Sequence, residues 1–424
     1  MASAFHTGTT RGRTPLVTTV VHPGDALTGR QRLVYILVLG GLTALGPFTI
    51  DLYLPAFPVL TEEFGVPDSV IQLTLTGTTI GFAVGQLFMG PWSDKVGRRL
   101  PLIIATSVHV FASLAASVSQ DVIVLTVFRV LQGAGAAAGG VVAMAMVRDL
   151  FGGKPLVRML SRLALVNGLA PILAPVIGSQ LLLLMPWRGL FWFLAAYGIV
   201  VVSCVAAFIV ETLPTERRVG KGHSTTLERY RNVFGDRIFV GVAIMGAMNF
   251  SGLFSYLSSS PFLFQELYAL DAQQYGLLFG VNSLGVVIGV QISSRLMRWY
   301  GPQWVLATTT IVQLLSAASM FILATTDAGL LGVLIPLFFY IMACGFSFPA
   351  VQVLGLVNHG HEAGTAASLL GALNFGVAGI TSPLVGALGV STQTMSSVMA
   401  GTAVVSIASL WAIVRPRSVP ALSD

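Results

Sequence analysis

The segment RGLFWFLAAYGIVVVSCVAAFIVE, residues 188–211, decides the fold class of this chain. Between Arg188 and Glu211 it holds no charged side chain, and an apolar stretch of about 18 residues or more can cross a bilayer as a helix. The run is continuous and does not alternate apolar and polar residues, as a strand of a membrane β-barrel does. A bilayer offers no water to backbone polar groups, so this stretch is predicted to be a transmembrane helix.

Eleven other segments have the same character, so the chain is predicted to be an all-α membrane protein with twelve transmembrane helices. Of its 424 residues, 54% are hydrophobic and 9% are charged. Soluble domains carry about 25% charged residues, so this chain has too few ions for a water-facing surface. The two cysteines lie within spans, where they are interpreted as small apolar residues and not as a disulfide. The predicted spans are residues 33–57, 70–92, 100–119, 121–147, 160–185, 188–211, 237–263, 273–297, 303–325, 329–356, 363–389 and 392–414.

The basic residues outside the spans predict the orientation of the chain. If both termini lie on one side, the loops and tails of that side hold 21 of the 23 Lys and Arg residues. Loops on the other side hold acids such as Glu62, Glu63 and Asp121. Because cytoplasmic loops carry the excess of Lys and Arg, we expect a multi-pass protein of the cell inner (plasma) membrane with cytoplasmic termini. This placement explains the net charge of +6, which therefore does not indicate nucleic-acid binding.

A polar stretch at residues 212–236 separates six predicted spans from the six others. A weak repeat at a constant offset relates the two halves, and it pairs Gly81, Gly85 and Gly97 with Gly285, Gly289 and Gly301. Two pseudo-symmetric six-helix bundles are therefore predicted, an arrangement in which transporters bind substrate near the midplane. The expected organisation is a disordered cytoplasmic tail (1–31), an N-terminal bundle (32–211), a cytoplasmic linker (212–236), a C-terminal bundle (237–414) and a cytoplasmic tail (415–424).

The loop after the second span reads GPWSDKVGRR, residues 90–99. Gly97 allows a tight turn, and Asp94 can accept hydrogen bonds from helix-end amides or from Arg98. Together with Gly90, these residues predict a cytoplasmic gate that latches two helices and releases them as the bundles move. Asp149, at the cytoplasmic end of the fourth span, is expected to join this network. The alternative is a basic loop that serves only to orient the chain.

Two charged residues lie well inside predicted spans, away from the span ends. Arg129 is in the fourth span, where a cation costs about 2.5–3.5 kcal/mol and is expected to face a partner or a wet cavity. Asp51 is the one acid well inside the first span. Burial disfavours the charged form of a carboxylate, so Asp51 is the candidate proton carrier or cation-binding group. The alternatives are a structural arginine between helices and an acid at a helix end.

The fifth span has a face of small residues and prolines, made of Gly168, Pro171, Pro175 and Gly178. Small residues let helices approach closely, and proline removes a backbone donor. A polar and aromatic set could line an amphipathic cavity, although each amide taken singly is more often a link between helices. The predicted cavity residues are Tyr53, Asn167, Asn249, Phe250, Phe254, Tyr256, Asn282 and Asn374.

These segments resemble the major facilitator superfamily, within it the drug:proton antiporters of twelve spans, and most closely the bicyclomycin/chloramphenicol-resistance (Bcr/CflA) family. The resemblance runs from about residue 32 to 415, and its segments include IDLYLPAFPVL, GQLFMGPWSDKVGRR, FRVLQGAGAA, MVRDLF and APILAPVIG. Ala174 stands where many relatives have Gly before Pro175. The resemblance implies alternating access driven by inward proton flow. It also implies that Asp51 and Arg129 couple protons and that Asp94, Arg98 and Asp149 form the gate.

The predicted function is proton-coupled efflux of small amphipathic drugs by alternating access. The alternatives are export of an endogenous metabolite, such as an amino acid or dipeptide, and a membrane sensor or scaffold that binds a ligand without moving it. The sequence has no Walker lysine motif, nucleophile elbow or zinc signature, so we expect no enzymatic activity, cofactor or metal. The expected partners are a small-molecule substrate, protons and the lipid bilayer, for a monomeric protein.

Overall fold

The computed structural model describes residues 23–218, 226–326, 328–359 and 363–419. Within them, twelve helices are long and apolar enough to cross a membrane, as predicted. The spans of the N-terminal half are built on α1 (Gly29–Asp51), α3 (Asp68–Val96), α4 (Arg99–Ser117), α5 (Val122–Leu150), α6 (Gly153–Leu184) and α7 (Trp187–Phe208). Those of the C-terminal half are built on α9 (Arg237–Phe262), α10 (Ala272–Tyr300), α11 (Pro302–Thr325), α12 (Gly329–Leu356), α13 (Ala363–Ala387) and α14 (Thr392–Ser409).

Three segments predicted as tails or linker contain helical structure. A 3₁₀ turn covers Pro23–Ala26, and α1 begins at Gly29 because Thr28 and Gln31 form a capping box. The linker contains a 3₁₀ turn at Thr215–Arg217 and the short helix α8 (Thr226–Phe234). A further 3₁₀ turn, Pro416–Ser418, lies in the C-terminal tail. The rest of the predicted disordered tail, residues 1–22, lies outside the described residues.

The glycine repeat corresponds to equivalent close contacts in the two halves. A side chain on Gly81 would meet the carbonyl of Val130, which brings α3 against α5. A side chain on Gly289 would meet the carbonyl of Met342, which brings α10 against α12 in the same way. Gly97 and Gly301 end α3 and α10 with φ of 104° and 77°, a region that L side chains rarely adopt. Glycine at these positions therefore determines the helix packing and the turn of each half.

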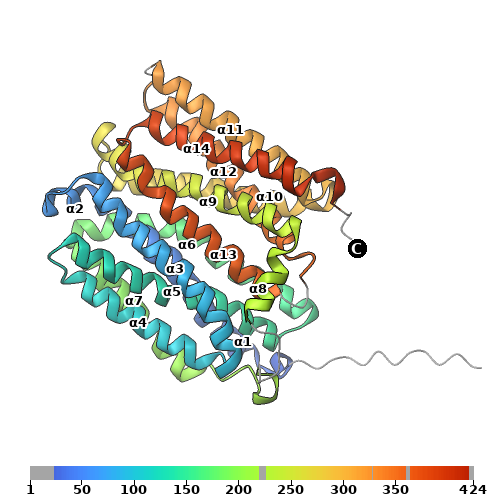
Figure 1. Cartoon of the computed structure of the whole chain (residues 1–424). Helices are drawn as coiled ribbons and strands as arrows, with labels where there is room; N and C mark the ends of the chain where they lie inside the picture. Colours follow the sequence, from blue (N-terminus) through green and yellow to red (C-terminus); the bar gives the residue numbers. More distant parts are fainter. Residues whose placement is uncertain (1–22, 219–225, 327, 360–362, 420–424) are drawn as a thin grey trace, which may run out of the picture.

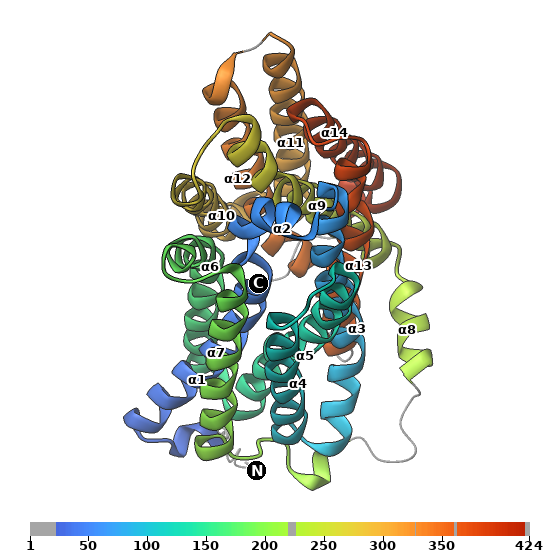
Figure 2. The ribbon, with the colours of Figure 1, turned by 90° about the vertical axis from the view of Figure 1, so that its left-hand side faces the viewer.

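The two halves meet along two seams. Figure 1 shows the N-terminal half, from blue to green, beside the C-terminal half, from yellow to red. One seam joins α3 to α13, and the other joins α6 to α10. After α1, a 3₁₀ turn (Leu54–Ala56) leads into the short helix α2 (Phe57–Phe64), which ends at Gly65 with φ of 61°. Viewed from the end where α2 lies, α2 is placed between the two halves (Figure 2).

Candidate functional site

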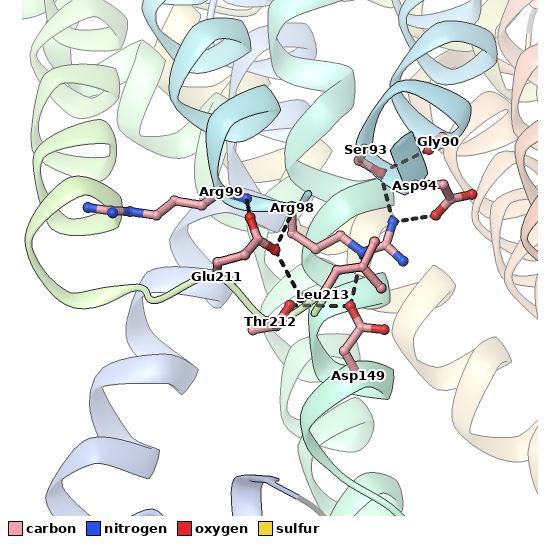
Figure 3. Close-up of polar contacts among 9 residues, drawn as sticks. All are labelled: Gly90, Ser93, Asp94, Arg98, Arg99, Asp149, Glu211, Thr212 and Leu213. Atoms are coloured by element: carbon pink, nitrogen blue, oxygen red, sulfur yellow. Dashed lines mark hydrogen bonds and ion pairs between the residues drawn. The ribbon is translucent and has the colours of Figure 1, made fainter. Parts of the chain in front are cut away.

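A cluster of charges lies where α3 turns into α4 (Figure 3). The Arg98 guanidinium donates to Asp149 Oδ2 at 2.9 Å, to Asp94 Oδ1 at 2.5 Å and to Ser93 Oγ at 2.9 Å. Ser93 Oγ in turn donates to the carbonyl of Gly90 at 2.9 Å. The structure therefore brings the predicted gate residues together in one network, which we call the Arg98 clamp.

Glu211, just after α7, completes the clamp. Its carboxylate accepts the backbone N–H groups of Arg98 at 2.8 Å, Arg99 at 3.2 Å and Leu213 at 2.9 Å. The first of these amides belong to the start of α4, where helix N–H groups have no partner within the helix. Thr212 Oγ1 also donates to Asp149 Oδ2 at 3.2 Å. The sequence analysis did not include Glu211 among the gate residues, although it is an acidic residue at the end of a span where basic residues predominate.

The electrostatics of the clamp favour the charged forms of its members. Burial lowers the pKa of Arg98, but hydrogen bonds and charge from Asp149 and Asp94 outweigh it and raise the pKa above its usual value. Burial raises the pKa of Glu211, but the backbone N–H groups of Arg98, Leu213 and Arg99 outweigh it and lower that pKa. The clamp joins α3, α5 and the segment after α7, all within the N-terminal half.

Arg129 is fully buried on α5, and its partners come from α1, α5 and α7. The guanidinium donates to the Thr49 carbonyl at 2.9 Å and to Gln132 Oε1 at 2.5 Å. Its Cζ lies 4.1 Å from the centre of the Tyr53 ring and 5.6 Å from that of Phe191, so it also makes cation–π contacts. The Thr49 carbonyl lies in the last turn of α1, where helix carbonyls lack partners. Arg129 thus anchors the end of α1.

Asp51 is the last residue of α1 and is only 5% exposed. Its position agrees with the alternative of a helix-end acid, but a carboxylate there meets the negative end of the helix dipole and gains no stability from it. Within the described residues, no ion pair links Asp51 to Arg129. Asp51 lies instead within electrostatic reach of the Tyr256 and Tyr275 hydroxyl groups, in the other half of the molecule.

Aromatic side chains from both halves meet around Phe375 of α13. Phe82 of α3 stacks on Phe375 with ring centres 5.1 Å apart. Two predicted cavity residues of α9, Phe250 and Phe254, lie 5.2 and 6.0 Å from Phe375. Phe348 joins them at 5.2 Å from Phe250. Of these five aromatic residues, only Phe250 and Phe254 were predicted from the sequence to line the cavity. The others lie on different helices and become their neighbours only in the fold.

The remaining predicted cavity residues fall into different environments. Tyr256 stacks on Phe279 at 5.5 Å and accepts a hydrogen bond from Asn282 at 3.2 Å, so it links α9 to α10 within the C-terminal half. Asn249 is held within that half, because it accepts from Gln313 at 2.5 Å and donates to the Cys344 carbonyl at 3.4 Å. Tyr53 is buried beneath Arg129, Asn374 is buried on α13, and Asn167 is exposed on α6.

The small-residue face of α6 contacts both halves. A side chain on Gly178 would meet the carbonyl of Leu52, so α6 lies directly against the end of the first span. Pro175 has no N–H for the Pro171 carbonyl, and this carbonyl accepts from Ser283 of α10 at 3.4 Å instead. The predicted antiporter helix therefore forms one side of the α6–α10 seam.

At the α2 end, the halves are joined by a set of contacts that we call the outer seal. Gln265 donates to the Pro55 carbonyl at 3.2 Å, and the Phe57 ring lies 5.7 Å from that of Phe262. Within the N-terminal half, Glu63 of α2 accepts from the Trp187 indole at 2.6 Å and pairs with Arg188. Glu63 thus ties α2 to the N-terminal half.

Comparisons with known proteins agree with this architecture. Residues 39–383 match the family model described as Major Facilitator Superfamily. The chain is 34% identical over 348 residues to an uncharacterized MFS-type transporter, YdgK, of Bacillus subtilis, covering 82% of this chain and 87% of that one. It is 28% identical over 351 residues to a bicyclomycin resistance protein homolog of Haemophilus influenzae, covering 83% and 88%.

The chain is also 28% identical over 345 residues to the multidrug resistance protein MdtL of Vibrio parahaemolyticus, covering 80% of this chain and 84% of that one. Among solved structures, it resembles the xylose transporter XylE of E. coli in a partially occluded inward open conformation. The TM-score is 0.75 at 13% identity, covering 91% of this chain and 98% of that one. At this identity the likeness concerns the fold alone.

Proposed function

Because the chain belongs to the Major Facilitator Superfamily, we propose that it exports small amphipathic, drug-like compounds from the cytoplasm in exchange for protons. Relatives named for resistance to bicyclomycin and to multiple drugs support drugs as cargo over a metabolite. The excess of Lys and Arg at the end that holds the Arg98 clamp supports an inner-membrane location with both termini in the cytoplasm.

The observation that carries proton coupling is the Asp51 carboxyl group. It is 5% exposed, lies at the end of α1 but within the first span, which runs from Gly29 to Phe64, and has no ion-pair partner within the described residues. The hydroxyl groups of Tyr256 and Tyr275, across the boundary between the halves, lie within electrostatic reach of it. A carboxyl group in that place can bind a proton or a cationic group of the substrate, and it changes its surroundings when the halves move apart. Arg129 holds the backbone beside it.

Transport by reconstituted protein with an imposed pH gradient tests the coupling. Asp51→Asn mimics the protonated carboxyl group, so it is expected to abolish uphill efflux while leaving downhill exchange. Asp68→Asn, which removes a carboxylate at the start of α3, is the matched control and is expected to retain uphill efflux. If Asp51→Asn concentrates substrate as well as the parent does, the proton passes elsewhere.

The cargo class has its own test. Expression in an efflux-deficient host should raise resistance to bicyclomycin or chloramphenicol, and the increase should depend on Asp51. If resistance is unchanged and the same cells export dipeptides, the cargo of the transporter is a metabolite instead.

We also propose that the Arg98 clamp acts as the cytoplasmic gate. It ties α3 and α5 to the segment that leads into the linker, so it can make these elements move as one body. Asp94→Asn removes one carboxylate from the guanidinium while packing is retained, and it is expected to slow transport strongly. If Asp94→Asn and the parent protein have equal turnover in vesicles, the clamp does not act as the gate.

A further inference from the structure

The end of the α6–α10 seam that lies on the clamp side is rich in arginine. Arg158 and Arg162 are exposed on α6, and Arg295 and Arg298 are exposed on α10. The two pairs belong to different halves of the molecule. None of the contacts described above uses them, so the proposed function leaves this group of charges unexplained.

Continued along both helices, the register of the seam brings Arg158 and Arg298 to the same end of it. A side chain on Gly280 of α10 would lie 3.3 Å from Val176 of α6, so these two positions face each other. Arg158 comes eighteen residues before Val176, and Arg298 comes eighteen residues after Gly280. Eighteen residues are about five turns of an α-helix, so both arginines return to the faces that form the seam.

No acidic side chain neutralises these arginines within the described residues. Four acids at this end are engaged elsewhere: Asp94, Asp149 and Glu211 belong to the Arg98 clamp, and Asp236 caps α9 and contacts Asn358. Positive charges of both halves therefore lie at the same end of the seam. This arrangement calls for an anion from outside the protein.

The surroundings of the arginines indicate the level of lipid headgroups. The aromatic rings of Trp299 and Tyr300 are 80% and 63% exposed, and aromatic residues of this kind gather at membrane–water interfaces. Towards the middle of the spans, both helices expose aliphatic side chains beside the seam. These side chains are Leu165, Leu169 and Leu173 on α6, and Leu284, Ile288 and Ile292 on α10. A molecule bound here would meet cations at one end and a hydrocarbon surface along the rest.

The other seam is covered by protein at the same end. There α8 packs against α13, and the Tyr230 hydroxyl donates to the Leu87 carbonyl of α3 at 3.5 Å. Figure 2 shows α8 beside α3 and α13, on the side of the molecule away from α6 and α10. At this end, α8 therefore covers the α3–α13 seam but not the α6–α10 seam.

We propose that an anionic phospholipid binds at the cytoplasmic end of the α6–α10 seam. Its phosphate lies between Arg158 and Arg298, and its acyl chains lie on the exposed aliphatic side chains of α6 and α10 beside the seam. Guanidinium groups bind phosphate oxygens in a bidentate manner, and basic pockets between transmembrane helices suit anionic headgroups. Arg162 and Arg295 add positive charge at the edges of this site. Since the two central arginines belong to different halves, the lipid links the halves and favours the state in which these helix ends lie together.

This inference rests on the proposed orientation, which places the site in the cytoplasmic leaflet, but it does not depend on the cargo or on proton coupling. The test is therefore a binding experiment. The full chain is placed in phosphatidylcholine nanodiscs with or without phosphatidylglycerol, and its thermal unfolding midpoint is measured. Phosphatidylglycerol is expected to raise the midpoint of the parent protein, because a ligand that binds the folded state stabilises it.

The double variant Arg158→Gln/Arg298→Gln is expected to lose at least half of that rise. Arg158→Lys/Arg298→Lys keeps the charges and should retain most of it, which separates lost binding from poor folding. The control Arg231→Gln/Arg417→Gln removes two exposed cations elsewhere and should retain the full rise. An unchanged rise in the first variant, or an equal loss in the control, would overturn the proposal. So would an equal rise on adding inorganic phosphate to phosphatidylcholine nanodiscs, since the site would then bind any phosphate.

Discussion

At the scale of single residues, the two carboxylates of the Arg98 clamp differ in environment. The Asp149 side chain is 17% exposed and the Asp94 side chain is 37% exposed, beside a guanidinium that is 9% exposed. Asp149→Asn should therefore lower the free energy of unfolding by about 2 kcal/mol, because it weakens a charged hydrogen bond to a buried cation. Asp94→Asn should cost about 0–1 kcal/mol, as exposed pairs do. Unfolding midpoints in one detergent compare them, and equal losses would contradict this ranking.

The contribution of Glu211 should depend on pH. Its pKa in the folded protein lies below its ordinary value of 4.5, so the folded state holds the ionised form more strongly than the unfolded chain does. The stabilisation is therefore fully present above about pH 4.5 and is lost as the pH falls through the folded value. The midpoint difference between parent and Glu211→Gln should be constant near neutral pH and shrink in acid. A midpoint difference that grows as the pH falls would contradict this prediction.

At the scale of elements, two glycines of α6 make a matched pair. A side chain on Gly178 would collide with the Leu52 carbonyl, whereas one on Gly168 would find Val287 at 3.6 Å, an ordinary contact. Gly178→Ala should therefore push α6 away from the first span and sharply reduce the yield of folded protein. Gly168→Ala should be neutral or stabilising by about 0.5–1 kcal/mol, since alanine favours the helix. Monodisperse yield after membrane extraction measures both, and similar yields would refute the close approach.

At the scale of the whole molecule, the outer seal should open during transport. Phe57 and Phe262 belong to different halves, and their ring centres are 5.7 Å apart. In a background with Cys204 and Cys344 replaced by alanine, Phe57→Cys/Phe262→Cys joined by a short bifunctional thiol reagent should stop transport. The pair Phe64→Cys/Trp187→Cys spans the same 5.7 Å within one half. Its cross-linking should leave transport largely intact. Continued transport after cross-linking of the first pair would show that the seal does not open.

Twelve spans and the family could be predicted from the sequence because the bilayer acts on each segment separately. A long apolar run must form a helix whatever its neighbours are. The clamp could be predicted in part for a related reason: Gly90, Asp94, Gly97 and Arg98 lie within one short loop, so their spacing already brings them together. Glu211 lies more than a hundred residues further on, and nothing local connects it to that loop.

Only the tertiary structure decided how the buried polar residues are paired. From the sequence, Asp51 and Arg129 were the two charges of one bundle and the obvious partners for proton coupling. In the fold, Arg129 donates to the Thr49 carbonyl and lies over the Tyr53 ring, while Asp51 lies near tyrosines of the other half. Likewise, Asn249 is held within its own bundle by Gln313, and Phe82 meets Phe375 across a seam. Hydrophobicity sets where a helix lies in the membrane, but its rotation about its own axis is set by contact with its neighbours.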